Sequence, residues 1–311
     1  MTMRLRAARN ACLWLTLASA ALSGGTALAR PTLRVAYAGS MGTVMDRNLG
    51  PAFAKAHGAD YQGIGHGAYG LARLLASKHM RADVFVSVTP GPMRILIERG
   101  LVDHAVPVAS TRMVIAYNPN SRFAPDFRAA ARGKQKWYEV LQEKGLRFGR
   151  TDPATDPQGR NIVFTFQLAE RYYHRPGLVK KILGSPENPK QIFAESALIT
   201  RLESGQIDAS SGYRSAVVSR GLPYVSLPPQ IDLSRPGLQK SWYRKAGFRL
   251  KGKTGKPREV HPQPLVFYAA VLNNAANPKA GRQFVKFMQS AKGQAMLRKD
   301  GYGPPHGSVL R

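Results

Sequence analysis

The stretch Leu146-Arg-Phe-Gly-Arg-Thr-Asp-Pro-Ala-Thr-Asp-Pro-Gln-Gly-Arg160 predicts a strand, a turn and a helix in direct succession. Residues 146–148 are typical of the end of a short buried strand, which two Asp-Pro pairs then stop. Proline suits the first turn of a helix, and the aspartate before it can cap free backbone amides, so a helix is expected over 161–173. The amides and the helix dipole at such a turn favour an anion. The alternative is that both Asp-Pro pairs are ordinary caps.

Two stretches near the N-terminus repeat this order of strand, turn and helix. Residues 33–37 alternate like a strand, Gly39-Ser40-Met41-Gly42 forms a tight turn, and 43–57 has the periodicity of a helix. Ser40 adds a hydroxyl to the backbone amides, although a plain cap is again the alternative. A strand at 60–64, a glycine-rich turn at 65–70 and a helix at 71–78 follow. The glycines of this second turn lack the spacing of a dinucleotide-binding fingerprint.

The rest of the chain continues the same alternation. We expect strands at 82–87, 113–119, 207–215, 224–228 and 264–272, helices at 92–99, 137–143, 196–204 and 279–298, and a polar loop at 120–136. Two regions joined by apolar crossover strands predict an α/β fold of two lobes with a cleft between them. The first lobe comprises residues 30–112 and 228–311, and the second lobe comprises residues 113–227. The candidate anion turns then lie at the carboxyl ends of strands, where open α/β sheets bind ligands.

The N-terminus predicts export. A basic start, an uncharged apolar run at 11–22 and Ala27-Leu28-Ala29 are typical of a signal peptide cleaved after residue 29, which predicts a periplasmic protein. A membrane anchor is the alternative, but the apolar run is short for a span. Cys12, the only cysteine, lies in this segment. The mature chain is therefore expected to have no disulfide and no thiolate metal site.

The formal net charge of +28 favours acidic partners such as small anions, nucleic acid or a membrane surface. The bases are scattered, apart from residues 240–258, which contain eight bases and no acid, interleaved with three aromatic residues. Such a segment can bind nucleic acid. The alternative, which we favour for an exported chain, is a mobile solvated loop whose aromatic side chains pack on the body of the protein.

Seven short motifs occur in order over nearly the whole mature chain: Ala38-Gly39-Ser40, Ala82-Asp83-Val84-Phe85, Tyr117-Asn118-Pro119, Arg147-Phe148-Gly149-Arg150-Thr151-Asp152-Pro153, Asp156-Pro157-Gln158-Gly159, Leu168-Ala169-Glu170 and Tyr213-Arg214-Ser215. Together they resemble the periplasmic solute-binding proteins for molybdate and tungstate, in the branch known mainly from archaea. The most specific of them is the run of two Asp-Pro pairs that ends in glycine. The resemblance implies a type II periplasmic-binding-protein fold, with a ligand cleft between two lobes and hinge strands. It also implies a monomeric binder that delivers its oxyanion to the membrane permease of an ABC importer.

The resemblance also implies a set of ligand-binding residues. In the first lobe these are Ser40 and Met41, together with Ala68, which stands where the family has a second serine. The backbone amide is kept at this position but the serine hydroxyl is lost. The protein is then open to a weaker affinity for the oxyanion or to a different anion preference. In the second lobe they are Asp156, Pro157, Gln158, Glu195 and Tyr213.

The two carboxylates distinguish between ligands. A carboxylate repels a dianion in a dry site, so sulfate or phosphate should exclude Asp156 and Glu195 unless a proton is shared. Molybdenum and tungsten are hard centres that accept further oxygen ligands. In the family two carboxylates complete the coordination of the metal in the bound oxyanion, and Asp156 and Glu195 are the matching residues. A receptor for sulfate or a small carboxylate, with the same fold, remains the alternative.

An enzyme is the less favoured class. The chain has no nucleophile elbow, no metal-binding histidine pair and no P-loop, and its seven histidines are scattered. We therefore expect no catalytic residue and no cofactor.

Overall fold

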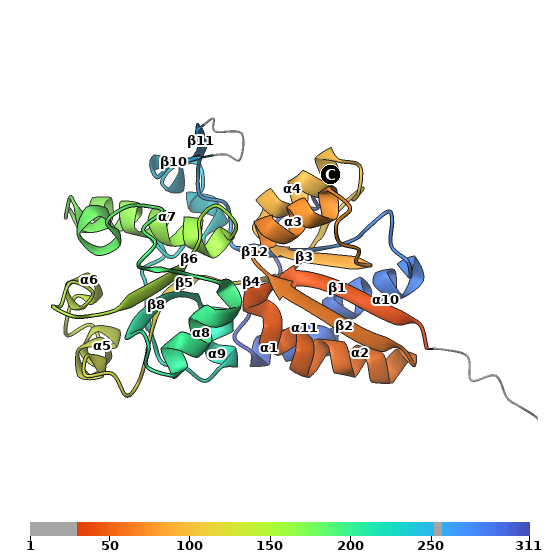
Figure 1. Cartoon of the computed structure of the whole chain (residues 1–311), viewed down its shortest axis with the longest axis horizontal. Helices are drawn as coiled ribbons and strands as arrows, with labels where there is room; N and C mark the ends of the chain where they lie inside the picture. Colours follow the sequence, from red (N-terminus) through yellow and green to blue (C-terminus); the bar gives the residue numbers. More distant parts are fainter. Residues whose placement is uncertain (1–29, 252–256) are drawn as a thin grey trace, which may run out of the picture.

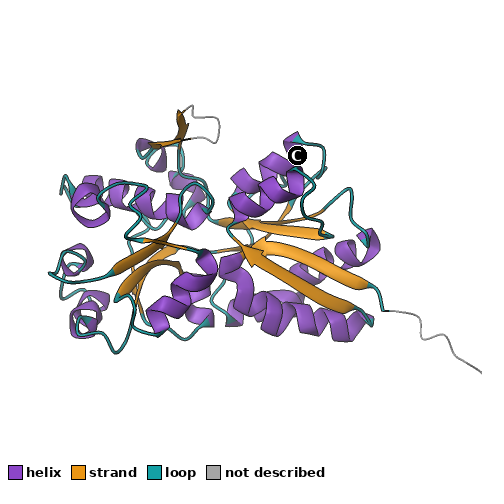
Figure 2. Cartoon of the chain, in the orientation of Figure 1, coloured by secondary structure: helices purple, strands orange, loops and turns teal. Residues whose placement is uncertain are grey.

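The computed structural model describes residues 30–251 and 257–311 (Figure 1). Two five-stranded mixed sheets lie side by side, and helices cover both faces of each sheet (Figures 1 and 2). This is an α/β fold of two lobes, as the sequence predicts. Within the described ranges no helix combines the length and the apolar character that crossing a bilayer requires. The predicted signal peptide, residues 1–29, lies outside the described residues.

The first sheet has the order β2-β1-β3-β12-β4. Its strands are β1 (Thr32–Ala38), β2 (Asp60–His66), β3 (Val84–Val88), β4 (Val106–Ser110) and β12 (Val266–Val271). β1 is parallel to β2 and β3, whereas β12 is antiparallel to β3 and β4. The helical segments of this lobe are η1 (Gly39–Met41), α1 (Gly42–Val44), η2 (Met45–Leu49), α2 (Gly50–His57), α3 (Ala68–Ala76), α4 (Pro90–Glu98), α10 (Pro278–Gln289) and α11 (Ala291–Lys299).

The second sheet has the order β7-β6-β8-β5-β9. Its strands are β5 (Met113–Tyr117), β6 (Phe148–Thr151), β7 (Ile192–Phe193), β8 (Ala209–Tyr213) and β9 (Tyr224–Ser226). β6 is parallel to β7 and β8, and β5 is antiparallel to β8 and β9. The helices of this lobe are α5 (Ala124–Ala131), α6 (Trp137–Val140), α7 (Pro157–Tyr172), η3 (Val179–Leu183), α8 (Glu195–Glu203) and α9 (Arg214–Ser219).

Aromatic side chains pack the helices of each lobe against one another. In the first lobe the rings of Phe53 and Phe284 meet edge to face with centroids 5.2 Å apart, which joins α2 to α10. In the second lobe Trp137 of α6 packs on Phe166 of α7 at 5.5 Å. Such pairs contribute about 0.5–1.5 kcal/mol beyond the area they bury.

The chain passes between the lobes in two extended connections. The first joins β4 to β5 and the second leads from β9 to β12, and Thr111 N–H donates to Leu265 O where they run together. Part of the second connection packs on α7 of the second lobe, because Thr165 donates to Ile231 O and the Gln167 amide donates to Gly247 O. The boundary of the lobes at residues 227 and 228 stays a prediction.

Several local predictions were wrong. The predicted polar loop at 120–136 contains α5, which begins in the Ala124-Pro125 turn and continues through an alanine-rich run. The predicted last helix is two helices, because Ser290 is extended and caps α11 by accepting from Gly293 N–H. β6 begins at Phe148, where the sequence suggested a strand end, so this strand reaches further toward the Asp-Pro turns.

The basic segment forms a hairpin of β10 (Phe248–Lys251) and β11 (Pro257–Val260), which follows two short turns, η4 (Pro236–Leu238) and η5 (Tyr243–Lys245). Residues 252–256 lie outside the described residues. The aromatic side chains of the basic segment pack inward, since Trp242 donates to Gln230 O at 2.7 Å and the centroid of the Phe248 ring lies 5.2 Å from that of Phe164. They are therefore committed to the protein body rather than free to stack on nucleic-acid bases.

Candidate anion-binding site

The segments predicted to bind an anion meet where the two lobes face each other. η1 and the start of α3 come from the first lobe, and the starts of α7 and α8 and the end of β8 come from the second. Figure 1 shows α8 beside the start of the first lobe's helical segments. The first-lobe segments lie at least 89 positions before the second-lobe segments in the sequence, so only the packing of the lobes brings them together.

Glu195 crosses from the second lobe to the first. It is the first residue of α8, and its carboxylate accepts Ser40 N–H at 2.8 Å through Oε1 and Gly39 N–H at 3.0 Å through Oε2. A Cβ added to Gly39 would lie 2.7 Å from Glu195 Oε2, so only glycine permits this approach. The two carboxylate oxygens occupy the places that two oxygens of an anion would take at this turn. The turn therefore presents two inward-pointing backbone amides.

Asp156 is the N-cap of α7, as the Asp-Pro motif predicts. Its Oδ1 accepts Gln158 N–H at 2.6 Å, and its side chain is only 2% exposed. Its Oδ2 is buried and has no donor among the described residues. The carboxyl group of Glu195 lies within hydrogen-bond reach of Asp156, and it can serve as a donor only when it carries a proton.

The two acids lie close together, with Asp156 buried and Glu195 half-buried. Burial, followed by repulsion from Asp156, raises the pKa of Glu195 well above its ordinary value. Burial also raises the pKa of Asp156, although hydrogen bonds to its carboxylate oppose this. A close pair of carboxyl groups of this kind retains a proton more readily than a single exposed group. The pair can therefore approach an anion with less than two full negative charges.

Tyr213 ends β8 beside this pair. Its side chain is fully buried, and its Oη accepts the Asn161 amide at 2.9 Å, which leaves the phenolic proton free to donate. Burial, followed by the nearby charge of Asp156, raises the pKa of Tyr213 well above its ordinary value, so the phenol stays neutral. Tyr213 is therefore suited to donate one hydrogen bond to an anion.

Gln158 and Pro157 shape the turn before α7. The Gln158 side-chain amide donates to Ser211 O at 3.2 Å, which ties the turn to β8, and its backbone amide is held by Asp156. Pro157 has no N–H to offer and occupies the first helical position. These two residues thus position the turn in the structure.

The first lobe contributes three further predicted residues. Ser40 Oγ is buried and has no partner among the described residues, so its hydroxyl is available. Met41 is fully buried in the core of the lobe. Ala68 is the first residue of α3 and is also fully buried, and no side chain caps this helix.

The lobes touch closely at Gly67, a contact that sequence reasoning missed. A Cβ at this position would lie 2.9 Å from Thr155 O of the second lobe. Gly70 N–H donates to the same carbonyl at 3.2 Å, and Arg73 donates to Ala154 O at 2.9 Å. No local pattern could have revealed these contacts, because they depend on how the lobes meet.

A cavity of about 410 Å³ is lined by Glu195 of the carboxyl pair and by residues of both lobes. Its polar lining includes Tyr37, Ser40, Asp46, Gln158 and Glu195. Tyr37 donates to Asp46 at 2.6 Å, so this part of the wall is already satisfied. The described part of the chain holds no group of three or more His, Cys, Asp or Glu side chains suited to a metal ion.

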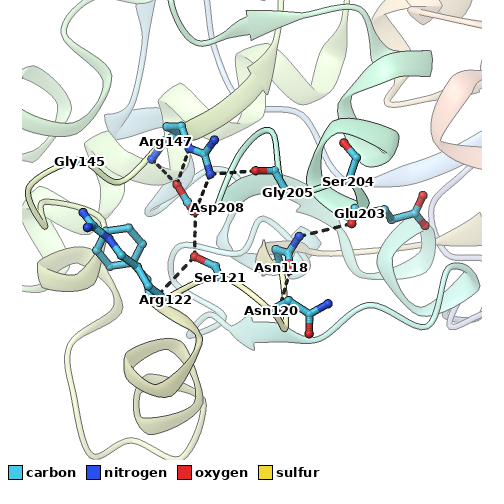
Figure 3. A pocket seen from close by; sticks show the side chains of 11 residues that line it. Asn118, Asn120, Ser121, Arg122, Gly145, Arg147, Glu203, Ser204, Gly205 and Asp208 are labelled. Carbon is cyan, nitrogen blue, oxygen red and sulfur yellow. Dashed lines mark hydrogen bonds and ion pairs between the residues drawn. The ribbon is translucent and has the colours of Figure 1, made fainter.

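Another cavity lies in the second lobe, and the polar side chains that line it stabilise the fold by bonding to one another (Figure 3). Arg147 pairs with Asp208 at 2.9 Å, and Ser121 donates to the same carboxylate at 2.8 Å. The Asn118 amide donates to Leu202 O at 2.6 Å. These groups satisfy one another, and the pair fixes loops that lead into β6 and β8.

Comparison with known proteins agrees with this architecture. The family model for bacterial extracellular solute-binding proteins matches residues 33–303. A molybdate/tungstate-binding protein, WtpA, from Pyrococcus abyssi is 28% identical over 259 residues, which cover 77% of this chain and 73% of that protein. A solute-binding protein of Petrotoga mobilis, named as uncharacterized, is 32% identical over 207 residues, which cover 64% of this chain and 61% of that protein.

The structure of the periplasmic molybdate-binding protein of Azotobacter vinelandii has the same fold. It superposes with a TM-score of 0.63 and 16% identity, over 88% of this chain and 100% of that chain. The type II binding-protein fold expected from the sequence is thereby confirmed, as is the family. The chain belongs to the bacterial extracellular solute-binding proteins, which bind a solute and are not enzymes.

Proposed function

We propose that this chain is the solute-binding component of an ABC importer and that it binds tungstate or molybdate between its lobes. The observation that carries the proposal is that the Gly39 and Ser40 amides of the first lobe donate to Glu195, which lies beside Asp156 in the second lobe. The similarity to the molybdate/tungstate-binding protein of P. abyssi supports it. The permease partner, the monomeric state and the periplasmic location belong to the same proposal.

Binding requires the lobes to separate and close again. As they open, Glu195 leaves the first-lobe amides, and the oxygens of the entering oxyanion take its place there. Ser40 Oγ and the Tyr213 phenol have protons to donate to the remaining oxygens. Closure of two domains around a ligand is a common mechanism of solute binding.

The carboxyl pair then selects the ligand. In the complex that we propose, Asp156 and Glu195 approach the central atom of the anion. Their negative charges repel the anion, which makes the binding of sulfate or phosphate unfavourable. The metal of tungstate or molybdate accepts carboxylate oxygens as added ligands, because hard centres favour oxygen donors. We therefore assign both carboxylates to the metal of the bound oxyanion, with no resident metal or cofactor.

A second candidate is a receptor for another anion, such as sulfate or a small carboxylate. One observation favours it: a carboxylate, that of Glu195, already fits the amides of Gly39 and Ser40. The absence of a hydroxyl at Ala68 and the raised pKa of Glu195 are also compatible with a ligand of lower charge.

Isothermal titration calorimetry of the mature protein with tungstate, molybdate, sulfate, phosphate and acetate decides between the candidates. We expect one site with submicromolar affinity for tungstate or molybdate and at least about 100-fold weaker binding of the other anions, a difference of about 2.7 kcal/mol. Preferential binding of sulfate or acetate would support the second candidate. No heat and no thermal shift with any of the five would overturn both.

A further inference from the structure

A larger cavity, of about 710 Å³, lies on the other side of the start of α7. It shares no lining residue with the cavity beside the carboxyl pair. Its wall comes from three parts of the fold: α3 and α4 of the first lobe, α7 of the second, and the connection that carries the β10–β11 hairpin. Pro157 lines this cavity whereas Gln158 lines the other, so the first turn of α7 separates the two.

The wall of this second cavity is strongly basic. Five cationic side chains line it, against two carboxylates, which leaves a surplus of three positive charges. Within residues 30–251 and 257–311, none of the five lies within 4.0 Å of a carboxylate; of the two acids, only Glu259 has a partner, His261 at 3.6 Å. The five cations are Arg94, Arg160, Lys240, Arg244 and Arg258.

Arg160 is the strongest single indication of an anion. It is only 5% exposed, and its guanidinium lies over the Tyr69 ring at 3.6 Å. Its Nε donates to Pro153 O at 2.7 Å, the one acceptor that it has among the described residues, although the group carries five N–H donors. Burial, together with the neighbouring charges of Arg258 and Arg73, lowers the pKa of Arg160. A buried cation without a carboxylate is unfavourable unless something else compensates it.

The opposite wall holds a strained residue. Thr89 has φ 66° and ψ 154°, a conformation that normally only glycine adopts and that costs about 1–3 kcal/mol. Its hydroxyl oxygen is buried without a partner in the described chain. The first free amide of α4, at Gly91, donates to Gln263 Oε1 at 2.9 Å, so the helix end itself is already capped. The arginines, and not the dipole of α4, are therefore the groups that favour an anion here.

We propose that this cavity is a second anion site, which takes a phosphate-bearing polyanion. The volume exceeds what one tetrahedral oxyanion fills and is in the range of pockets for larger ligands. The surplus of three positive charges matches a ligand with three or more negative charges. Guanidinium groups bind phosphate oxygens in pairs, which suits the two donor-bearing nitrogens that Arg160 has unused.

The test uses the mature full-length protein and two probes, inorganic triphosphate and a sugar bisphosphate, which distinguish a condensed phosphate from an organic one. Each probe is titrated by calorimetry with and without saturating tungstate. We expect one equivalent of a probe to bind in both conditions. A probe that is displaced by tungstate binds the first site, and that result would overturn the proposal. Because the titration without tungstate needs no tungstate binding, failure of the first site and failure of the second are distinguishable.

Variants locate the binding. Arg244 and Arg258 are exposed, so the double substitution R244Q/R258Q should leave the fold intact and weaken the probe at least tenfold without changing tungstate affinity. The matched control is R132Q/K134Q, which removes two exposed charges next to α5. R160Q should weaken the probe further, with folding checked by circular dichroism. Three results would refute the proposed second anion site. They are equal weakening of the probe by R132Q/K134Q, unchanged probe binding in R244Q/R258Q, and no binding of either probe at millimolar concentration.

Discussion

Substituting Gly67 by alanine tests whether the lobes must close to bind. Gly67 has φ −54° and ψ 119°, which alanine adopts without strain, so the fold itself should tolerate the change. The new Cβ would lie 2.9 Å from Thr155 O across the lobe boundary, whereas ordinary contacts are 3.4–4 Å. The closed arrangement must therefore open locally by about half an ångström. Overpacking of this kind costs about 1–3 kcal/mol.

The free-energy cost of this overpacking destabilises only the arrangement in which the two lobes are closed. We expect G67A to weaken tungstate by roughly 5- to 150-fold, which corresponds to that free energy, while its unfolding temperature without ligand stays near that of the wild type. The matched control is G70A: a Cβ at Gly70 meets nothing within 4 Å, and its amide still donates to Thr155 O. Alanine within α3 should stabilise the protein by about 0.5–1 kcal/mol and leave affinity unchanged. Wild-type affinity in G67A, or equal losses in both variants, would refute the requirement for this contact.

Three further predictions concern the carboxyl pair and its neighbours. Y213F should bind tungstate about tenfold or more weakly with unchanged circular dichroism, since it removes one hydrogen bond to a charged group; calorimetry that finds equal affinities would show that the phenol does not reach the ligand. The pKa of Glu195 is raised in the folded state, so above about pH 4.5 the folded protein holds more protons than the unfolded chain. The free energy of unfolding should therefore fall as the pH rises from about 4.5 through the pKa of the folded state. Urea unfolding without added oxyanion should show this fall in the wild type and a smaller one in E195Q, and equal slopes would contradict the shared proton. A68S restores the family hydroxyl and should tighten tungstate by up to about tenfold, whereas an unchanged Kd would mean that this position does not contact the ligand.

Sequence reasoning predicted where two helices of the candidate site begin, because the signals for a helix start are local. The Asp-Pro motif identified Asp156 as a cap, and the structure places it at the N-cap of α7. Glu195 was expected just before a helix and is the first residue of α8. Short-range backbone chemistry decides both positions, so a single sequence carries the information.

The remaining features depend on packing between distant segments. The bond from Ser40 N–H to Glu195 spans 155 positions, and the stacking of Arg160 on Tyr69 joins different lobes. Neither contact has a periodic or compositional signal. The break at Ser290 was missed for a different reason, because the apolar pattern of the last helix continues on both sides of it.

The central claim is that Asp156 and Glu195 select the metal of an oxyanion, and the ratio of tungstate to sulfate affinity in E195A tests it most directly. Removing Glu195 also frees the amides of Gly39 and Ser40, but that effect is common to both anions and cancels in the ratio. Calorimetry with both anions should show the ratio falling at least about 100-fold relative to the wild type, a loss of about 2.7 kcal/mol of selective binding. A ratio that stays at the wild-type value would contradict the account.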